Sequence, residues 1–455
     1  MGDFKYLVAV VGAGPAGLFA ARQLANDGAH VFLFNRDIKA GGLAEYGIYP
    51  DKHKMRDGLH LQFRQILDLP GVEYYGNIVV GKQGVVSLDD LFRVGFQAVL
   101  VTAGAQGTKW LGLPGESLKG VYHAKDIVYH YNSLPPYSEV DFEIGKRVAI
   151  IGHGNVMLDI VHFLCDTVKV DEVYAIGRRG PNEVKFEKKE LGYVINQLDR
   201  TALAGELQRI TPTLQAIDQS PDPIWDVVNS ALEGADKPHS LTRFHLQFLA
   251  SPWRILGDAA GRVCGLEMEE NTLLVKDGEV KARGTSQHHT LDVDTVVFAI
   301  GDKVDDGFGL PVNGNEYVKN PEPRFPMDGL SYEVFEPHTD HIIEGVFVAG
   351  WSRKASTGLV GVARKDGTNG AKAVMQYLQT LPALNPVSLD QIRDFICSLR
   401  VPIVTEKDLL RLEAQEREQA EQRQLEVFKF RSNAEMLTAM ELSQDTGACG
   451  RDKLR

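Results

Sequence analysis

Apolar and polar positions along the chain repeat one pattern twice. An apolar run at residues 6–11 leads into a glycine-rich turn and then into a helix at 16–27. A second apolar run, in a predicted strand that starts at Lys146, leads into another glycine-rich turn and a helix that begins near Met157. Further short apolar runs, typical of strands buried on both faces, lie at 30–34, 97–105, 172–180, 295–301 and 345–351. This alternation predicts an α/β fold with two Rossmann-like dinucleotide-binding domains.

The two turns have the composition of phosphate-binding loops. The first contains Gly12, Gly14, Pro15, Ala16 and Gly17, and the second contains Gly152, His153, Gly154, Asn155 and Val156. In such a turn one glycine permits the sharp reversal, the next lets the backbone approach a pyrophosphate, and the helix amides face the phosphates. One turn is a weak signal, and an ordinary strand-to-helix turn is the alternative at each site. Two turns on one chain predict a flavin and a nicotinamide nucleotide, and hence a flavoprotein that moves hydride.

Length, charge and cysteine content narrow the class of protein. The 455 residues exceed what one core holds, so we expect two domains. A net charge of −12 argues against nucleic acid and anionic membranes as partners. The four cysteines are scattered without a CxxC pair, which excludes a redox disulfide and an iron–sulfur cluster on this chain. We expect no metal site and no membrane span, and the absence of a signal peptide pattern predicts a cytoplasmic protein.

Several polar and aromatic residues follow the predicted strands. Arg178 and Arg179 end the strand after the second turn, where guanidinium groups bind the 2′-phosphate of NADP; a solvated basic pair is the alternative. Asn35 ends the strand after the first turn, where an acid commonly binds a ribose. Trp351 follows Gly350 and is either a neighbour of the flavin or a packing residue. Residues 405–428 predict a solvated surface helix, with a coiled-coil helix as the alternative.

Segments along the whole chain resemble the adrenodoxin reductase class of ferredoxin–NADP reductases. They read VVGAGPAG, GGLAEYGIYPD, YYGNIVVG, LPGESLKGVYHAKDIVYHYNSLP, IGHGNVMLDIV, IGRRGPNEVKFEKKEL, AGWSRKASTGLV and NAEMLTAM. The small subunit of glutamate synthase shares the two-domain plan but fits these segments less well. The resemblance implies an NADP domain inserted into a discontinuous FAD domain. The expected bounds are 1–108 for the first part of the FAD domain, 109–329 for the NAD(P) domain, and 330–455 for the second part with a helical tail.

The resemblance also implies site residues. FAD contacts are expected from the loop at Gly42 and from Ala16, Asn35 (a Glu in the family), Leu43, Val80, Trp351, Gly358, Leu359 and Val360. NADP contacts are expected from His153, Gly154, Asn155, Val156, Arg178, Arg179 and Glu190, with Trp351 and Gly358 near the nicotinamide. The role of Glu190 depends on the resemblance alone.

Two departures from the family pattern affect the expected function. Lys52 replaces a histidine implicated in proton handling, and His53 follows one residue later, so Lys52, His53 and Trp351 are candidates for positions beside the reaction. The family's docking patch for an acidic ferredoxin is basic, whereas here the corresponding segment carries Asp218, Asp222, Asp226, Glu233 and Asp236. Because like charges repel, we expect a different partner.

These observations predict an FAD-dependent oxidoreductase that exchanges hydride with NAD(P)(H). It would exchange single electrons with an iron–sulfur protein or with an iron–sulfur subunit of a larger complex. Two alternatives stay open, a reductase of a small acceptor such as a quinone and a flavin-bearing structural subunit with a decayed nicotinamide site.

Overall fold

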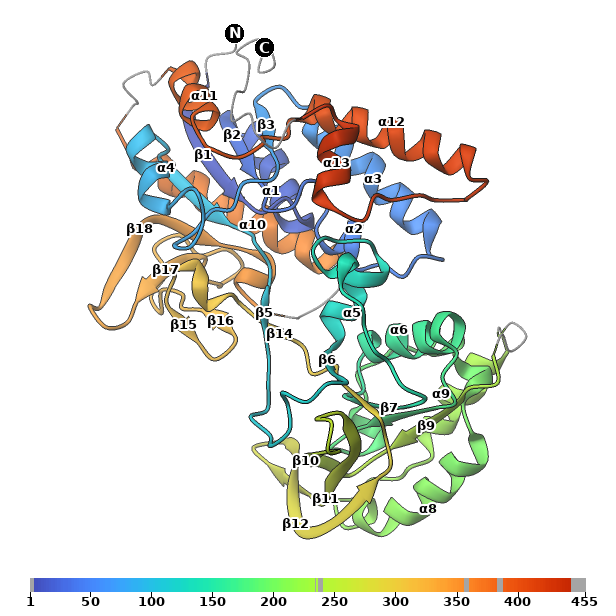
Figure 1. The fold of residues 1–455 in the computed structure, drawn as a ribbon. Helices are drawn as coiled ribbons and strands as arrows, with labels where there is room; N and C mark the ends of the chain where they lie inside the picture. The colour runs from blue at the N-terminus through green and yellow to red at the C-terminus, as the bar shows by residue number, and fades with distance from the viewer. Residues whose placement is uncertain (1–3, 234, 236–239, 356–359, 383–387, 443–455) are drawn as a thin grey trace. The chain divides into compact units, whose positions relative to one another are not determined.

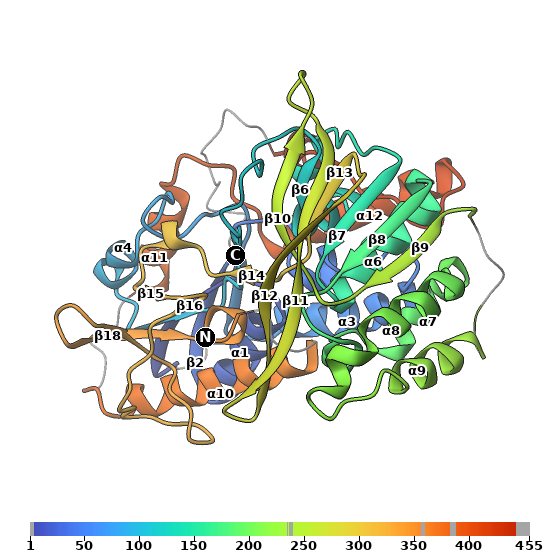
Figure 2. The same cartoon turned by 90° about the horizontal axis from the view of Figure 1, so that it is seen from below.

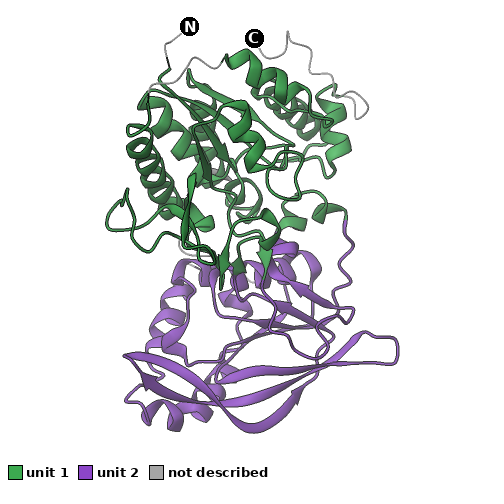
Figure 3. Cartoon of the chain, turned by 90° about the vertical axis from the view of Figure 1, so that its left-hand side faces the viewer, with its two compact units in different colours: residues 1–108, 129–139, 302–455 green, residues 109–128, 140–301 purple. Residues whose placement is uncertain are grey.

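The chain folds as two compact units of alternating strands and helices. The computed structural model describes residues 4–233, 235, 240–355, 360–382 and 388–442. Unit 1 comprises residues 1–108, 129–139 and 302–455, and unit 2 comprises 109–128 and 140–301 (Figure 3). Residues 129–139 and 302–329 thus cluster with unit 1, whereas the expected bounds assign them to the NAD(P) domain. Unit 1 resumes at residue 302 because β14 (Asp302–Lys303) pairs antiparallel with β5 (Gly107–Thr108), a strand of that unit.

A six-stranded sheet forms the centre of unit 1 (Figure 1). Its strand order is β17-β18-β4-β1-β2-β3, and every neighbouring pair except β17–β18 is parallel. The strands are β1 (Tyr6–Val11), β2 (Ala29–Phe34), β3 (Val72–Tyr75), β4 (Ala98–Val101), β17 (Glu333–Glu336) and β18 (His341–Val348). Because β1, β2 and β4 consist almost entirely of buried apolar residues, both faces of the sheet are covered.

Helices from both ends of the chain cover this sheet. Residues of α1 and α10 share one core cluster with alternate residues of β1, while residues of α4 and α11 share the cluster on the other face. The helices of unit 1 are α1 (Pro15–Asn26), α2 (Leu43–Tyr46), α3 (His53–Leu67), α4 (Leu88–Val94), α10 (Val360–Leu378), α11 (Leu389–Cys397), α12 (Glu406–Gln422) and α13 (Asn433–Ala439), and α5 (Ala124–Tyr131) crosses the bound between the units. Two strand pairs, β5–β14 and β15 (Val312–Asn313) with β16 (Glu316–Tyr317), complete it.

Unit 2 repeats the same plan. Its parallel sheet has the order β6-β13-β7-β8-β9, so strand β7 lies at the position that β1 takes in unit 1. The strands are β6 (Val121–His123), β7 (Arg147–Ile151), β8 (Glu172–Ile176), β9 (Arg243–Gln247) and β13 (Thr295–Phe298), and the helices are α6 (Asn155–Phe163), α7 (Lys188–Gly192), α8 (Arg200–Gln215) and α9 (Pro223–Leu232). The predicted fold class, two Rossmann-like domains, is confirmed.

A long antiparallel sheet in unit 2 lies outside the sequence prediction. It consists of β10 (Ala250–Gly257), β11 (Val263–Lys276) and β12 (Glu279–Leu291), seen as a twisted ribbon in Figure 2. β11 alternates buried and less buried residues, while β12 is exposed along most of its length. Because β12 has no buried face, it has no alternating apolar pattern, and the sequence therefore does not indicate this strand.

The predicted surface helix at 405–428 is only partly solvated. It is helix α12, and Leu409 and Leu412 are buried in the unit 1 core. Its buried stripe also carries two carboxylates, Asp408 and Glu416. The helix therefore packs onto unit 1 along one face. Within the described part of the chain, no helix combines the length and apolar character needed to cross a membrane.

Candidate dinucleotide-binding sites

The first glycine turn joins β1 to α1 in a geometry that only glycine permits. Gly12 has φ +108°, and a Cβ there would lie 2.6 Å from the carbonyl oxygen of Thr102. A Cβ on Gly17 would lie 1.9 Å from the carbonyl oxygen of Gly12, so the third glycine lets α1 start directly above the strand end. Gly14 is the N-cap of α1 and makes no side-chain cap, and Pro15 is the first helical residue. The amides of the first turn of α1 are therefore oriented for an anionic ligand.

A second glycine pair approaches this turn from the loop after β2. The Gly41 N–H donates to the carbonyl oxygen of Ala13 at 2.7 Å. Gly42 has φ +52°, and a Cβ there would lie 3.0 Å from the Cα of Gly14. The two backbones thus approach closely enough to exclude side chains, and Leu43 follows as the first residue of α2. This loop borders the site that the first turn forms.

Asn35 follows β2 directly, and its side chain turns toward the protein's own backbone. Its side chain is buried, and its Oδ1 accepts a hydrogen bond from the Ala13 N–H at 3.0 Å. Its Nδ2 donates to the carbonyl oxygens of Asp37 and Lys39 at 2.9 and 3.0 Å. The amide therefore ties the glycine turn to the loop after β2, and both of its polar atoms are already used within the protein. A ribose contact from Asn35 stays a prediction.

The segment after β18 closes over the start of α1. Gly350 has φ +64°, a Cβ there would lie 2.6 Å from the Cβ of Ala16, and its N–H donates to Asp366 at 2.7 Å. The guanidinium of Arg353 donates to the same carboxylate at 2.6 Å. A Cβ on Gly367 would lie 2.1 Å from the carbonyl oxygen of Ala16, so α10 packs tightly on α1. Nothing in the sequence pattern singles out Asp366, because a lone aspartate in a helix carries no motif.

The other residues predicted to contact the flavin lie at several positions in unit 1 or outside the described residues. Trp351 is half-buried in the short turn after Gly350, and Val360 begins α10. Gly358 and Leu359 lie outside the described residues. Val80 is buried in the unit 1 core.

The two candidates for proton handling lie at the start of α3. Lys52 is its N-cap. His53 is its first residue, but its side chain is outside the described part of the chain. Contacts of these residues with a flavin stay predictions.

The second glycine turn has the same backbone plan in unit 2. Gly152 has φ +124°, and a Cβ there would lie 2.3 Å from the carbonyl oxygen of Ala299. Gly154 is the N-cap of α6 without a side-chain cap, and a Cβ there would meet no atom within 4 Å. Met157, which stands where a small residue is usual, is fully buried beneath the helix. The open face at Gly154 fits a pyrophosphate, because a ligand can approach the backbone there.

The His153 ring points into unit 2 instead of outward. Its Nε2 donates to the carbonyl oxygen of Ala175 at 3.0 Å, and its ring meets the Phe248 ring edge-on at 5.0 Å. Burial lowers the pKa of His153 to about 4, although the bond to Ala175 opposes the shift, so the ring is neutral at pH 7. Gly177 is required beside it, since a Cβ there would lie 2.3 Å from Nδ1.

Arg178 and Arg179 lie just beyond β8, the strand next to β7 in the sheet. Arg178 is exposed and Arg179 half-buried. Neither guanidinium forms an ion pair with a described residue. Their backbone is fixed instead, because the Arg178 carbonyl accepts from Asn271 at 3.0 Å and the Arg179 carbonyl from the Leu249 N–H at 3.3 Å. Two free guanidinium groups on a fixed backbone are suited to bind a phosphate.

The segment after the arginine pair borders the second turn. The Lys185 N–H donates to the carbonyl oxygen of His153 at 2.8 Å, and the Glu187 N–H donates to Oδ1 of Asn155 at 2.7 Å. Val156 is 45% exposed on α6. Glu190 follows on α7, half-buried. Glu190 thus belongs to the segment that the turn contacts, while its role toward NADP stays a prediction.

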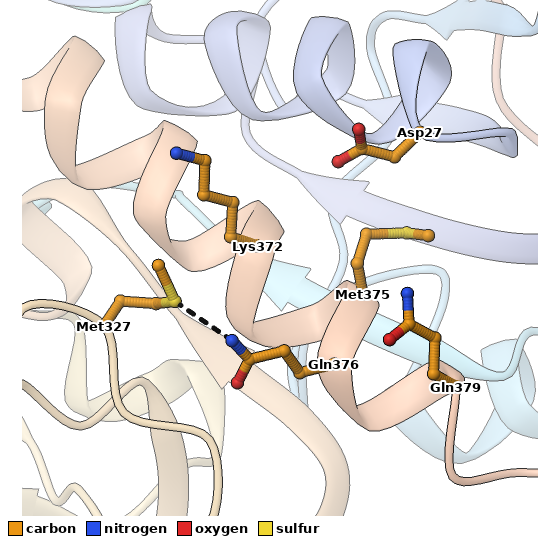
Figure 4. A pocket seen from close by; sticks show the side chains of 6 residues that line it. All are labelled: Asp27, Met327, Lys372, Met375, Gln376 and Gln379. Carbon is orange, nitrogen blue, oxygen red and sulfur yellow. Dashed lines mark hydrogen bonds between the residues drawn. The ribbon is translucent and has the colours of Figure 1, made fainter.

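A separate pocket at the far end of α1 contains no residue of either glycine turn. It is lined by Asp27, Met327, Lys372, Met375, Gln376 and Gln379 (Figure 4). The Gln376 amide donates to the Met327 sulfur at 3.5 Å, so the side chains partly satisfy one another. Asp27 caps the carboxyl end of α1, the end opposite to the glycine turn. This pocket is therefore no part of the dinucleotide site.

Comparisons with known proteins agree with this geometry. Residues 6–193 match the Pyridine nucleotide-disulphide oxidoreductase family. The NADPH:adrenodoxin oxidoreductase of Salvelinus fontinalis is 28% identical over 406 residues, covering 81% of this chain and 77% of that protein. The NADPH-ferredoxin reductase FprA of Mycobacterium leprae is 28% identical and covers 82% of this chain and 84% of that protein. The structure of Mycobacterium tuberculosis FprA in complex with NADPH superposes with a TM-score of 0.79 at 25% identity, over 96% of this chain and 99% of that one.

The chain is a relative of the adrenodoxin reductase-type ferredoxin–NADP reductases. The resemblance expected from its motifs is thereby confirmed. That family consists of FAD-dependent NAD(P)H oxidoreductases with two dinucleotide-binding domains, as the sequence predicts for this chain. The sequence has no CxxC pair, and none of the cysteines of the described part, Cys165, Cys264 and Cys397, forms a disulfide, so the disulphide in the name of the matching family has no counterpart among these residues.

Proposed function

We propose that this chain binds FAD at the first glycine turn and NADP(H) at the second, and passes electrons between NADP(H) and an iron–sulfur protein. The observation that carries the proposal is the arginine pair beyond the strand beside the second turn, Arg178 and Arg179, which forms no ion pair with the described residues. The names of the relatives, NADPH:adrenodoxin oxidoreductase and NADPH-ferredoxin reductase, support it.

The first turn fits the diphosphate of FAD. Gly14 makes no side-chain cap on α1, and a Cβ on Gly14 would meet only the Cα of Gly42, at 4.0 Å. A diphosphate can therefore approach the amides of Ala16 and Gly17. Gly350, held by Asp366, brings Trp351 to the same edge of the sheet. We propose that these elements hold the flavin, with Trp351 beside its ring system.

The second turn with the arginine pair favours NADP over NAD. Two guanidinium groups can donate several charge-assisted hydrogen bonds to a 2′-phosphate, which NAD lacks. Each such bond contributes about 1.5–3 kcal/mol, so one arginine is worth roughly 10–150-fold in affinity. The neutral His153 ring supports the turn from within and leaves the positive charge to the arginines.

The chain's own residues bind, orient and polarise, while the redox chemistry belongs to the cofactors. Bound FAD would supply the chemistry, namely hydride exchange with NADPH and single-electron transfer to an acceptor. The amides of α1 and α6 would hold the two diphosphates, and Arg353 with Asp366 would keep the segment at Gly350 in place. No side chain has to act as a nucleophile in this scheme.

The partner is proposed to present a neutral or basic docking face. Asp218, Asp222, Asp226 and Glu233 are all exposed on and beside α9, and Asp236 lies outside the described residues. None of these four carboxylates forms an ion pair with a residue that the structure describes. Such a surface repels an acidic ferredoxin. We therefore propose a dedicated iron–sulfur protein, or an iron–sulfur subunit of a larger complex, in the cytoplasm.

Purified protein tests the proposal in two steps. Acid-released flavin should be FAD in a 1:1 ratio to protein, and its visible absorbance should bleach anaerobically with NADPH. Flavin that stays oxidised would support a decayed nicotinamide site. Transfer to an acidic ferredoxin should be slow at low ionic strength and improve as salt screens repulsion. Fast transfer that declines with salt would overturn the partner proposal without affecting the cofactor proposal.

A further inference from the structure

A cleft in unit 1 lies outside the sites described so far. It has a volume of about 320 Å³ and lies between α3, α12 and residues 426–429. The helices α3 and α12 run side by side in Figure 1. Arg64 of α3 and Glu413 of α12 join the two helices by an ion pair. None of the residues of the two glycine turns lines this cleft.

Buried ion pairs form the inner wall of the cleft. Glu45 of α2 is 1% exposed, and its carboxylate is 3.0 Å from Nζ of Lys39 and 2.8 Å from Nζ of Lys429. Nε2 of His60 lies 2.6 Å from the other oxygen of Glu45, and Lys39 also contacts Glu416 at 2.8 Å. Each inner carboxylate thus already faces at least one cation.

Five permanent cations and six carboxylates line the whole cleft, so the local arrangement at its inner wall decides where an anion can bind. Burial disfavours ionised Glu45, but Lys39 and Lys429 outweigh it and hold its pKa well below the usual range. Burial lowers the pKa of Lys429, Glu45 opposes the shift, and the positive charges of Lys39 and Arg56 add to it. The inner wall holds three of these cations, Lys39, Lys429 and Arg56, and two of the carboxylates, Glu45 and Glu416.

Arg56 is a cation of this cleft for which no described residue serves as counter-ion. It lines the cleft from the first turns of α3 and is 5% exposed. Among the residues that the structure describes, its guanidinium has neither a hydrogen-bond acceptor nor an ion-pair partner. A guanidinium that lines a cleft without a counter-ion from the described residues is suited to bind an anion there.

We propose that this cleft binds a small oxyanion, a phosphate or carboxylate group, on the guanidinium of Arg56. The planar fork of an arginine matches both groups with two parallel hydrogen bonds. The volume admits a small anionic molecule and excludes a folded domain. Lys429 and His60 border the same cleft, and Arg56 supplies the recognition. The inference is independent of the flavin and nicotinamide sites.

Calorimetric titration of the flavin-loaded protein tests this site. Inorganic phosphate and acetate would be titrated separately at constant ionic strength, with chloride as the balancing anion. Since phosphate would also bind the arginine pair of unit 2, the titrations use the R178A/R179A protein. We expect saturable binding that Arg56→Gln weakens at least 10-fold and Arg56→Lys weakens less. Stronger binding of phosphate or of acetate tells which oxyanion group the cleft prefers.

Arg417→Gln is the matched control, because Arg417 lines the same cleft from an exposed position on α12. It should bind the anion as the parent protein does. Thermal unfolding gives a second readout, in which phosphate raises the melting temperature of the parent protein but not of Arg56→Gln. No saturable binding of either anion, or equal binding by Arg56→Gln and its parent, would overturn the proposal. If Arg56→Gln does not fold, the comparison of Arg56→Lys with Arg417→Gln decides.

Discussion

The two glycine turns have nearly the same backbone but different surroundings. Segments from distant parts of the chain, at Gly42, Thr102 and Gly350, close on the first turn. The second turn has Ala299 in the place of Thr102 and is also bordered by a segment a few dozen residues downstream, at 185–187, while its cap at Gly154 is open. A site assembled from distant segments is suited to a cofactor that stays bound, and an open site is suited to a ligand that exchanges.

The residues that follow the neighbouring strands also differ, because one is buried and the others are accessible. Asn35 is buried and directs its amide at the protein's own backbone. Arg178 and Arg179 are accessible, and their guanidinium groups form no ion pair in the described part of the chain. The same fold therefore uses one strand end to stabilise its own turn and leaves the guanidinium groups at the other accessible to a ligand.

The largest difference should appear when alanine replaces one glycine in each turn. Gly12→Ala forces a Cβ to within 2.6 Å of a backbone oxygen at φ +108°, so we expect loss of bound FAD and about 3 kcal/mol or more of destabilisation. Gly154→Ala meets open space at φ −108°, so stability and FAD content should stay near wild type while NADPH binds more weakly. Flavin content, urea unfolding and NADPH titration measure these effects. Equal loss of flavin in both variants would contradict the assignment of one nucleotide to each turn.

A smaller effect is expected at the second strand end. Replacing both Arg178 and Arg179 by alanine should raise KM for NADPH by roughly 100-fold or more and change KM for NADH little. The reason is that only NADPH carries the 2′-phosphate. Steady-state kinetics with both nucleotides measure the ratio, and Lys185→Ala, a nearby exposed cation, is the control. A parallel rise for NADH would mean that the arginines do not recognise this phosphate.

Much of the fold can be predicted from the sequence, because the elements that matter have strong local signals. The strands β1, β2 and β7 are continuous apolar runs, and each turn has glycines where sterics require them. Positions such as Gly12 and Gly152 therefore indicate the two sharp turns, and with them the candidate sites, before any tertiary contact is known.

The remaining features depend on long-range contacts that leave no local pattern. Asp366 acts on Gly350 across one loop, and Lys429 meets Glu45 from the far end of the chain. Asn35 occupies the predicted place in sequence, yet its side chain turns toward Ala13, and only the structure shows this. The tail helix α12 reads as solvated because its buried stripe includes charged residues that are paired only in the fold.

Asn35 offers a test of the structural role of the first strand end. Asn35→Ala removes the acceptor of the Ala13 N–H and the donor to Asp37 and Lys39, leaving buried backbone groups unpaired. We expect about 3 kcal/mol of destabilisation in urea unfolding. Asn182→Ala, which removes one exposed hydrogen bond to the Ser220 carbonyl, should change stability little. A variant that keeps its stability but binds FAD weakly would instead support the ribose role.

The smallest effect concerns the pH at which each unit loses stability. The pKa of His153 is lowered by burial to about 4 from 6.5, so the unfolded chain takes up this proton first and stability falls as pH drops from about 6.5 to 4. At pH 5 this amounts to about 2 kcal/mol in unit 2. In unit 1, burial alone would raise the pKa of Glu73, but hydrogen bonds from His30 and Arg393 outweigh it and lower the pKa to about 2 from 4.5. The stability that ionised Glu73 contributes is therefore lost only as the pH falls below 4.5.

Amide hydrogen exchange between pH 7 and pH 5 can follow the two units separately. We expect protection to decrease in β7 and β8 over this range, while β1 and β2 keep theirs. His153→Phe should remove only part of the decrease, because burial also lowers the pKa of His123 in unit 2 to about 4 and lowers the pKa of His245, and these contributions stay in place. Glu73→Gln is the control, since it should not alter exchange in unit 2. Equal loss of protection in both units above pH 5 would show that the buried histidines do not set the difference.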